Sequence, residues 1–159
     1  MPETKTNVMR FLDQKKVPYI PHSYPHDGGA VDGLTVASMT CQPPEKVFKT
    51  LAVRGGKGVY VFVIPVTGEL DLKKAASSVG EKSVSMLHVN ELLSVTGYVR
   101  GSCSPIGMKK RYRTVIDTSA LAQETILVSA GKIGAQVELS PRDLLALCAA
   151  EAADLTTEE

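Results

Sequence analysis

The sequence predicts an α/β fold, in which a curved, mixed and largely antiparallel sheet is flanked by helices. The middle of the chain holds short apolar runs separated by turns, whereas both ends carry apolar residues at helical spacing. Most successive strand candidates are close enough for antiparallel pairing. The 159 residues, of which 43% are hydrophobic, contain no repeat or long linker, so we expect one domain over residues 1–159.

Two helices and a hairpin are predicted in the first half of the chain. Apolar residues at helical spacing indicate a helix over 6–16, and a short extended piece follows it. A second helix over 34–41 ends before a pair of prolines. A glycine-rich connection then joins two strands, Val47–Val53 and Val59–Val66, into a hairpin.

The second half contains three further helices and three further strands. Asp71 N-caps a helix that ends at Gly80, and Asn90 N-caps a shorter helix. The last helix begins after Ser140, with proline at its first position. The expected strands are Thr114–Ile116, Thr125–Ser129 and Ala135–Leu139.

The charge balance argues against a strongly basic nucleic-acid binder, because 18 Lys and Arg against 17 Asp and Glu give a net charge of +1. Any RNA contact must therefore come from a local basic patch. No apolar run is long enough to cross a membrane, and the first residues lack the apolar core of a secretory signal. The three cysteines match no zinc or disulfide pattern, so we expect a cytoplasmic protein without membrane contact.

A single lysine, Lys49, interrupts an apolar strand. Because side chains alternate along a strand, Lys49 points to the same side as Leu51, while Thr50 points to the other side. A lysine on an apolar face either reaches solvent or meets a partner. The strand pattern alone leaves two interpretations open: an edge lysine that prevents aggregation, or a functional cation.

The segment 101–107, Gly-Ser-Cys-Ser-Pro-Ile-Gly, is the second unusual feature. Gly101 and Gly107 permit backbone angles closed to other residues, and Pro105 restricts one. Such a loop can direct N–H groups at an anion or a carbonyl oxygen, although a plain surface turn is the ordinary explanation of this composition. Cys103 is a rival candidate nucleophile, but no His–Asp pair lies near it in the sequence to activate it.

Two further clusters have ordinary alternatives. His22 and His26 look like a metal-binding pair, but Pro25 argues against a shared helical face, so we expect no metal site. The densest basic run lies just after the loop at 101–107; it is a solvated face by default, but its position makes it a candidate contact for RNA phosphates. Its members are Lys109, Lys110, Arg111 and Arg113.

Together these motifs resemble the prolyl-tRNA editing domain family, and especially its YbaK-type Cys-tRNA(Pro) deacylases, along nearly the whole chain. Phe48-Lys49-Thr50-Leu51 falls on the family's strand that bears a functional lysine, and residues 101–105 match its Gly-x-x-x-Pro motif. Ser102 and Cys103 stand where relatives typically have Gly and Ile, and the loop 28–33 lacks an aromatic residue of the family.

The resemblance implies a barrel-like sheet of six or seven strands surrounded by helices, with no metal and no cofactor. It implies that Lys49 is catalytic and contacts the tRNA 3′ end. Lys109, Lys110 and Arg111 follow the loop in the order that the family shows, and their position there makes them the expected contacts for tRNA phosphates. The implied substrate-binding residues are Tyr24, Thr50, Gly101, Ser102, Ser104, Pro105 and Ser129.

The expected function is that of a trans-editing deacylase that hydrolyses mischarged Cys-tRNA(Pro), with prolyl-tRNA synthetase as the natural partner. The resemblance implies that the substrate thiol attacks its own ester carbonyl, while the protein supplies position and oxyanion stabilisation. Two alternatives stay open: a sibling deacylase for Ala-, Ser- or Thr-charged tRNA, and a non-catalytic module that binds the tRNA end.

Overall fold

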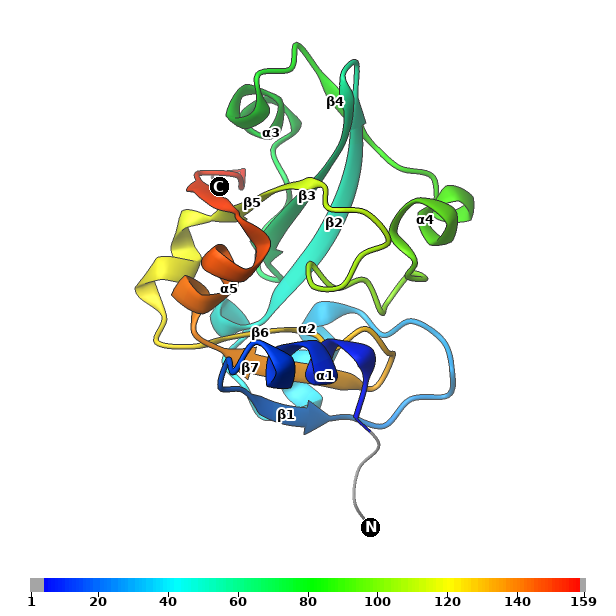
Figure 1. Cartoon of the computed structure of the whole chain (residues 1–159), viewed down its shortest axis with the longest axis vertical. Helices are drawn as coiled ribbons and strands as arrows, with labels where there is room; N and C mark the ends of the chain where they lie inside the picture. The colour runs from blue at the N-terminus through cyan, green and yellow to red at the C-terminus, as the bar shows by residue number, and fades with distance from the viewer. Residues whose placement is uncertain (1–4, 158–159) are drawn as a thin grey trace.

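The computed structural model describes residues 5–157, whose strands form two sheets (Figure 1). The three-stranded sheet has the order β1-β7-β6, and the five-stranded sheet has the order β4-β2-β3-β5-β8. Four neighbouring pairs are antiparallel, and β3–β5 and β5–β8 are parallel. The strands are β1 (Ile20–Ser23), β2 (Phe48–Gly55), β3 (Gly58–Pro65), β4 (Val84–Met86), β5 (Arg113–Asp117), β6 (Ile126–Ser129), β7 (Ala135–Leu139) and β8 (Glu151–Ala153).

The β2–β3 hairpin is the longest strand pair, and its register runs from Phe48 opposite Pro65 to Gly55 opposite Gly58. Six of the eight residues of β3 are buried, because apolar clusters cover it on both faces. Phe62 packs in the cluster that contains α3, and Val63 packs in the cluster that contains α1. This explains the continuous apolar run of β3, which is typical of a central strand.

The first three helices begin after residues whose side chains accept hydrogen bonds from backbone N–H groups of the first turn. The carboxylate of Asp71 accepts hydrogen bonds from the backbone N–H groups of Lys73 and Lys74, and Gly80 ends the helix in the left-handed conformation. The helices are α1 (Asn7–Gln14), α2 (Gly33–Met39), α3 (Leu72–Val79), α4 (Val89–Thr96) and α5 (Pro141–Cys148), with short 3-10 turns η1 (Pro44–Lys46) and η2 (Thr118–Ala122). None of the helices in the described part of the chain has the length and apolarity needed to span a bilayer.

One predicted cap is wrong. Asn90 lies inside α4, and His88 is the N-cap, because the carboxylate of Glu91 accepts a hydrogen bond from the His88 backbone N–H at 3.2 Å. This contact from the third helical residue moves the start of the helix towards the N-terminus.

The mixed α/β class and its mainly antiparallel pairing are confirmed, but the strand count and the single sheet are not. Eight strands form two sheets, and among residues 5–157 they do not close into a barrel. The additional strands, β4 and β8, each have three residues and depend on distant partners, so local patterning does not indicate them. Within residues 5–157, one isolated β-bridge, between Val47 and Leu127, connects the two sheets by backbone pairing.

Candidate functional site

A cavity of about 810 Å³ lies beside β2, between the segment around β4 on one side and strands β6 and β7 of the other sheet on the other side. Leu87 N–H donates to Ala52 O at 3.1 Å on one side of the gap, and Val47 bridges to Leu127 on the other. Between these contacts, the outer edge of β2 over 48–51 pairs with no strand among the described residues and borders the cavity. The other walls come from residues 30–36, the segment from β4 into α4, the start of the 101–107 loop, and β6 and β7.

Lys49 lies half-buried in the wall of this cavity. Within residues 5–157, no carboxylate lies within 4.0 Å of its ammonium group, in contrast to Lys46, whose Nζ lies 2.8 Å from Glu138 Oε2. An ammonium group without an ion-pair partner at a cavity wall is available to an anionic or carbonyl-bearing ligand. Lys49 and the start of the 101–107 loop therefore line the same cavity, as the following paragraphs describe for Gly101 and Cys103.

Two residues that line the cavity, Thr50 and Gln136, each carry a buried side-chain oxygen, Oγ1 and Oε1 respectively, without a hydrogen-bond partner among the described residues. Gln136 is only 6% exposed. Because buried polar atoms in folded proteins are nearly always paired, unpaired oxygens on two residues of one cavity wall make these residues candidate ligand contacts. The sequence analysis predicted Thr50 as a site residue but missed Gln136. The polar amide of Gln136 between the apolar residues Ala135 and Val137 could have indicated a functional position in that strand.

The start of the loop at 101–107 forms part of the cavity wall through Gly101 and Cys103. Gly101 has a φ of +90°, and a Cβ there would lie 2.8 Å from Ala30 Cβ, so only glycine fits. The N–H of Ser102 donates to Val99 O at 3.0 Å, whereas those of Gly101 and Cys103 have no acceptor among the described residues. Gly101 and Cys103 thus retain N–H groups that could bind a substrate oxygen.

Other predicted substrate-binding residues of the loop make internal contacts. Ser102 Oγ donates to Val99 O at 2.9 Å, and Ser104 Oγ accepts from Ile106 N–H at 3.2 Å. Ser129 lines the cavity, and its Oγ donates to Ser102 O at 2.9 Å, which ties β6 to the loop. Ser102, Ser104 and Pro105 are buried and do not line the cavity, so the structure places them behind its wall.

Cys103 lines the cavity, but burial raises the pKa of its thiol to about 12. A thiol with such a pKa stays protonated near neutral pH and is a poor nucleophile. The electrostatics therefore disfavour the alternative in which Cys103 attacks the substrate.

Tyr24 and the histidines lie outside this cavity wall. Tyr24 is 8% exposed, and its N–H donates to Gly134 O at 2.9 Å. His22 Nε2 lies 2.8 Å from the carboxylate of Glu138. No group of three or more His, Cys, Asp or Glu that could hold a metal is found within the described range.

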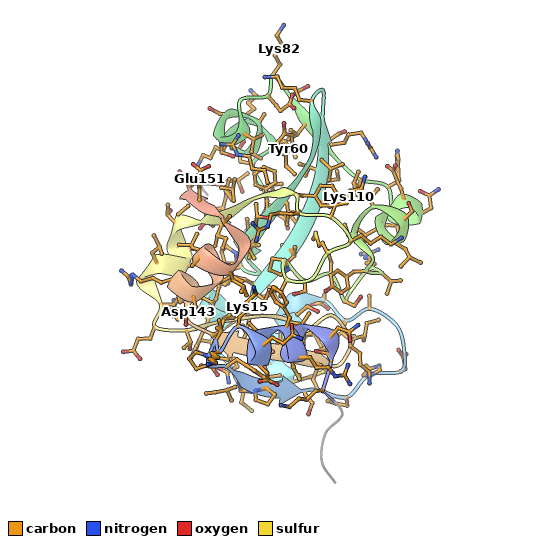
Figure 2. The ribbon with its side chains drawn as sticks, in the orientation of Figure 1. Lys15, Tyr60, Lys82, Lys110, Asp143 and Glu151 are labelled. Carbon is orange, nitrogen blue, oxygen red and sulfur yellow. The ribbon has the colours of Figure 1, made fainter. Side chains whose placement is uncertain are left out.

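Three members of the basic run, Lys109, Lys110 and Arg111, lie on the connection from α4 to β5, where Figure 2 labels Lys110, and Arg113 is the first residue of β5. Lys109, Lys110 and Arg111 are all exposed, and the last two line a smaller cavity of about 200 Å³ together with Pro105. The run is thus accessible, but its side chains do not line the larger cavity. Arg100 does line it and is exposed; sequence reasoning missed this cation, although it directly precedes Gly101.

Comparison with known proteins shows the family of this chain. The chain matches the model of the aminoacyl-tRNA editing domain over residues 31–147 and belongs to that family. It is 44% identical over 158 residues to EbsC of Enterococcus faecalis, a candidate Cys-tRNA(Pro)/Cys-tRNA(Cys) deacylase, which covers 99% of this chain and 96% of that protein. YwhH of Bacillus subtilis, an uncharacterized protein, is 30% identical over 100 residues, which is 62% of this chain and 63% of that protein.

Solved structures agree on the fold. A candidate trans-editing enzyme for prolyl-tRNA synthetase superposes with a TM-score of 0.83 at 23% identity, over 98% of this chain and 100% of that chain. The hypothetical protein APE2540 superposes with a TM-score of 0.86 at 23% identity, over 96% of this chain and 100% of that chain.

Proposed function

We propose that this chain is an aminoacyl-tRNA deacylase that acts in trans as a single editing domain and removes cysteine from tRNA(Pro). The observation that carries this proposal is one cavity whose lining residues carry an ammonium, two loop N–H groups and two buried oxygens that all lack partners among residues 5–157. Membership of the editing-domain family and the similarity to EbsC support the reaction class.

Lys49 and the loop are the proposed catalytic groups. The ammonium of Lys49 holds the tRNA 3′ end through its phosphate, because a compact positive charge suits this ligand. The N–H groups of Gly101 and Cys103 donate to the ester carbonyl oxygen and stabilise the negative charge that develops on it. Their rigid attachment, through Ser102 and Ser129, keeps these donors in position.

Thr50 and Gln136 are the proposed contacts for the amino-acid part of the substrate. The Oγ1 of Thr50 and the Oε1 of Gln136 can both accept hydrogen bonds, and the α-ammonium of an aminoacyl ester has three N–H donors. Binding would therefore satisfy two oxygens that find no partner within residues 5–157.

The nucleophile in this proposal is the thiol of the substrate cysteine. Its sulfur attacks the ester carbonyl carbon, the carbonyl–oxygen bond to the ribose breaks, and the ribose oxygen takes up a proton. The products are the free tRNA hydroxyl and a cyclic thioester of cysteine, which water then opens. This scheme requires no protein nucleophile, in keeping with the protonated state of Cys103.

Two other functions stay in consideration: a sibling deacylase for Ala-, Ser- or Thr-charged tRNA, and a binding module without turnover. The test is to incubate the purified full chain with Cys-, Ala-, Ser- and Thr-charged tRNA(Pro) and to follow loss of the amino acid. We expect cleavage of the cysteinyl ester to be the fastest. Faster cleavage of another ester would favour the sibling, and binding without cleavage would favour the module.

Prolyl-tRNA synthetase is the proposed partner, because cysteine and proline differ little in volume and a synthetic pocket separates such ligands poorly. A synthetase that mischarges tRNA(Pro) would supply the substrate of this enzyme. Adding the deacylase to a charging reaction should lower accumulation of Cys-tRNA(Pro) without lowering that of Pro-tRNA(Pro); equal loss of both would contradict the proposal.

A further inference from the structure

The ion pair between Lys46 and Glu138 connects the two sheets beside the cavity. Lys46 is the last residue of η1, which leads through Val47 into β2 of the five-stranded sheet, whereas Glu138 lies on β7 of the three-stranded sheet. The two side chains are only 23% and 11% exposed, so the pair is less screened by solvent than a surface pair. Within residues 5–157, no other ion pair runs from the segment leading into β2 to the three-stranded sheet.

The backbone bridge between the sheets lies next to this ion pair. Val47, which directly follows Lys46, forms the bridge to Leu127, and Leu127 lies opposite Glu138 in the register of β6 and β7. The bridge and the ion pair thus close a ring of four residues across the two sheets. A shared apolar cluster also holds the sheets together, but apolar packing is non-directional. The bridge and the ion pair are therefore the contacts that fix the alignment of β2 against the other sheet.

The proposed catalytic groups are divided between the two sides that this ring joins. Lys49 follows on β2, whereas Gln136 lies on β7, two residues before Glu138 and on the same side of that strand. The loop with the N–H donors is attached to the three-stranded sheet, because Ser129 Oγ on β6 donates to Ser102 O at 2.9 Å. The alignment of the sheets therefore sets the separation between the ammonium on one side and the loop donors on the other.

We infer that Glu138 is a positioning residue for the reaction, and that it acts through Lys46. The ion pair holds the start of β2 against β7 and thereby keeps Lys49 at the separation from the loop donors that deacylation requires. This inference rests on the proposed function, in which one transition state needs groups from both sheets. Such a reaction is sensitive to small shifts, because a displacement of about 1 Å can lower a rate about a hundredfold.

The test is steady-state deacylation of Cys-tRNA(Pro) by the full chain and its Lys46→Met variant, which removes the charge but keeps the apolar stem. We expect kcat to fall about tenfold and KM to stay within about twofold of wild type, because the loop donors act mainly in the transition state. The assay is run at a temperature at which melting curves show every variant to be folded. A wild-type kcat in Lys46→Met would overturn the inference.

Thr125→Val is the matched control. The hydroxyl of Thr125 donates to the same Oε2 atom of Glu138, but Thr125 directly precedes β6, so this contact stays within the three-stranded sheet. The variant should lower the melting temperature and keep the wild-type kcat. An equal fall of kcat in Thr125→Val and Lys46→Met would show that Glu138 matters only for stability, and would overturn the positioning role.

Two further variants test whether the effect passes through the ion pair. Lys46→Arg keeps a cation that can pair with a carboxylate, so its kcat should stay within about threefold of wild type. Glu138→Gln should lower kcat, and the double variant Lys46→Met, Glu138→Gln should be no slower than Lys46→Met alone, because both remove one contact. A Lys46→Arg variant as slow as Lys46→Met, or losses that multiply in the double variant, would contradict the inference.

Hydrogen exchange of the uncomplexed chain separates this inference from the proposed function. Lys46→Met should speed exchange in β6, across the gap from the substitution, whereas Thr125→Val should leave exchange in η1 and the start of β2 unchanged. If the wild type cleaves no charged tRNA but exchange changes as expected, the contact between the sheets is supported and the deacylase is overturned. If the wild type cleaves Cys-tRNA(Pro) while Lys46→Met changes neither kcat nor exchange, the deacylase stands and the positioning role is overturned.

Discussion

At the scale of single residues, two lysines three positions apart have different environments. Lys46 forms an ion pair with the largely buried Glu138, whereas Lys49 has no such partner in the described chain and lines the cavity. Lys49→Ala should therefore remove most deacylase activity and leave the melting temperature nearly unchanged, because it deletes a charge rather than core packing. Activity above about a tenth of wild type would contradict the catalytic role.

Lys46→Ala is the matched control. It should lower the melting temperature, because it leaves the carboxylate of Glu138 partly buried with one fewer donor. If Lys49→Ala destabilises the fold as much as Lys46→Ala does, the structural interpretation of Lys49 is the better one.

Glu138 gives a prediction about pH. Burial opposes its ionisation, but hydrogen bonds from Lys46, Thr125 and His22 prevail and lower its pKa from 4.5 to about 2. A lowered folded-state pKa means that the carboxylate stabilises the fold above about pH 4.5, and that this contribution is lost as the pH falls towards 2. Glu138→Gln should therefore lower the melting temperature most near neutral pH, and the difference from wild type should shrink on acidification.

The control for this prediction is Glu124→Gln, which removes an exposed carboxylate without a salt bridge in the described chain. Its melting temperature should differ little from wild type across the same pH range. A difference between wild type and Glu138→Gln that stays constant with pH would contradict the role of ionised Glu138.

At the scale of elements, the 101–107 loop depends on one backbone position. Gly101→Ala should lose activity, because its φ is +90° and the new Cβ would lie 2.8 Å from Ala30 Cβ, which forces the cavity wall to move. Gly28→Ala is the matched control: its φ is +97°, but a Cβ there meets nothing within 4 Å. The measurement is the deacylation rate of each folded variant, with its melting temperature as a check on the fold. If Gly101→Ala is as active as Gly28→Ala, the backbone geometry of the loop is not important for activity.

The basic run on the connection from α4 to β5 gives a second prediction at this scale. Neutralising Lys109, Lys110 and Arg111 together should weaken tRNA binding and flatten its dependence on salt, because fewer phosphate counterions are released. Binding is measured over a series of salt concentrations. The control triple variant neutralises Lys15, Lys16 and Lys82, exposed cations of which Figure 2 labels Lys15 and Lys82 away from Lys110. If both triple variants change the salt dependence of tRNA binding equally, the effect comes from net charge alone and not from a specific contact of Lys109, Lys110 and Arg111.

At the scale of the whole molecule, the proposed reaction uses a nucleophile from the substrate, the cysteine thiol, and none from the enzyme. Cys-tRNA(Pro) should be cleaved far faster than Ser-tRNA(Pro), because a thiol ionises near neutral pH and a hydroxyl does not. Methylation of the substrate sulfur should block cleavage, and Cys103→Ser should change the rate little. Rapid cleavage of the methylated ester, or an inactive but folded Cys103→Ser variant, would point to activated water or a protein nucleophile.

The predicted helices and the main hairpin agree with the structure because their signals are local. Asp71 and Gly80 bound α3 through hydrogen bonds and dihedral angles within a few residues. The strands β4 and β8 escaped prediction, because three residues carry little periodicity and both pair with strands far away in the sequence. Ser102, Ser104 and Pro105 were expected at the substrate, but whether a loop side chain faces a cavity or its own backbone depends on how the loop packs.

The sequence by itself determined the family, the position of Lys49 on an apolar strand and the glycine-containing loop at 101–107. These features depend on residue identity and short spacing. Only the tertiary structure decided that the sheets part between Val47 and Ala52, and that Gln136, Arg100 and Met86 line the resulting cavity. These residues lie on separate elements, and a cavity wall is set by packing between elements, which no local pattern of polar and apolar residues encodes.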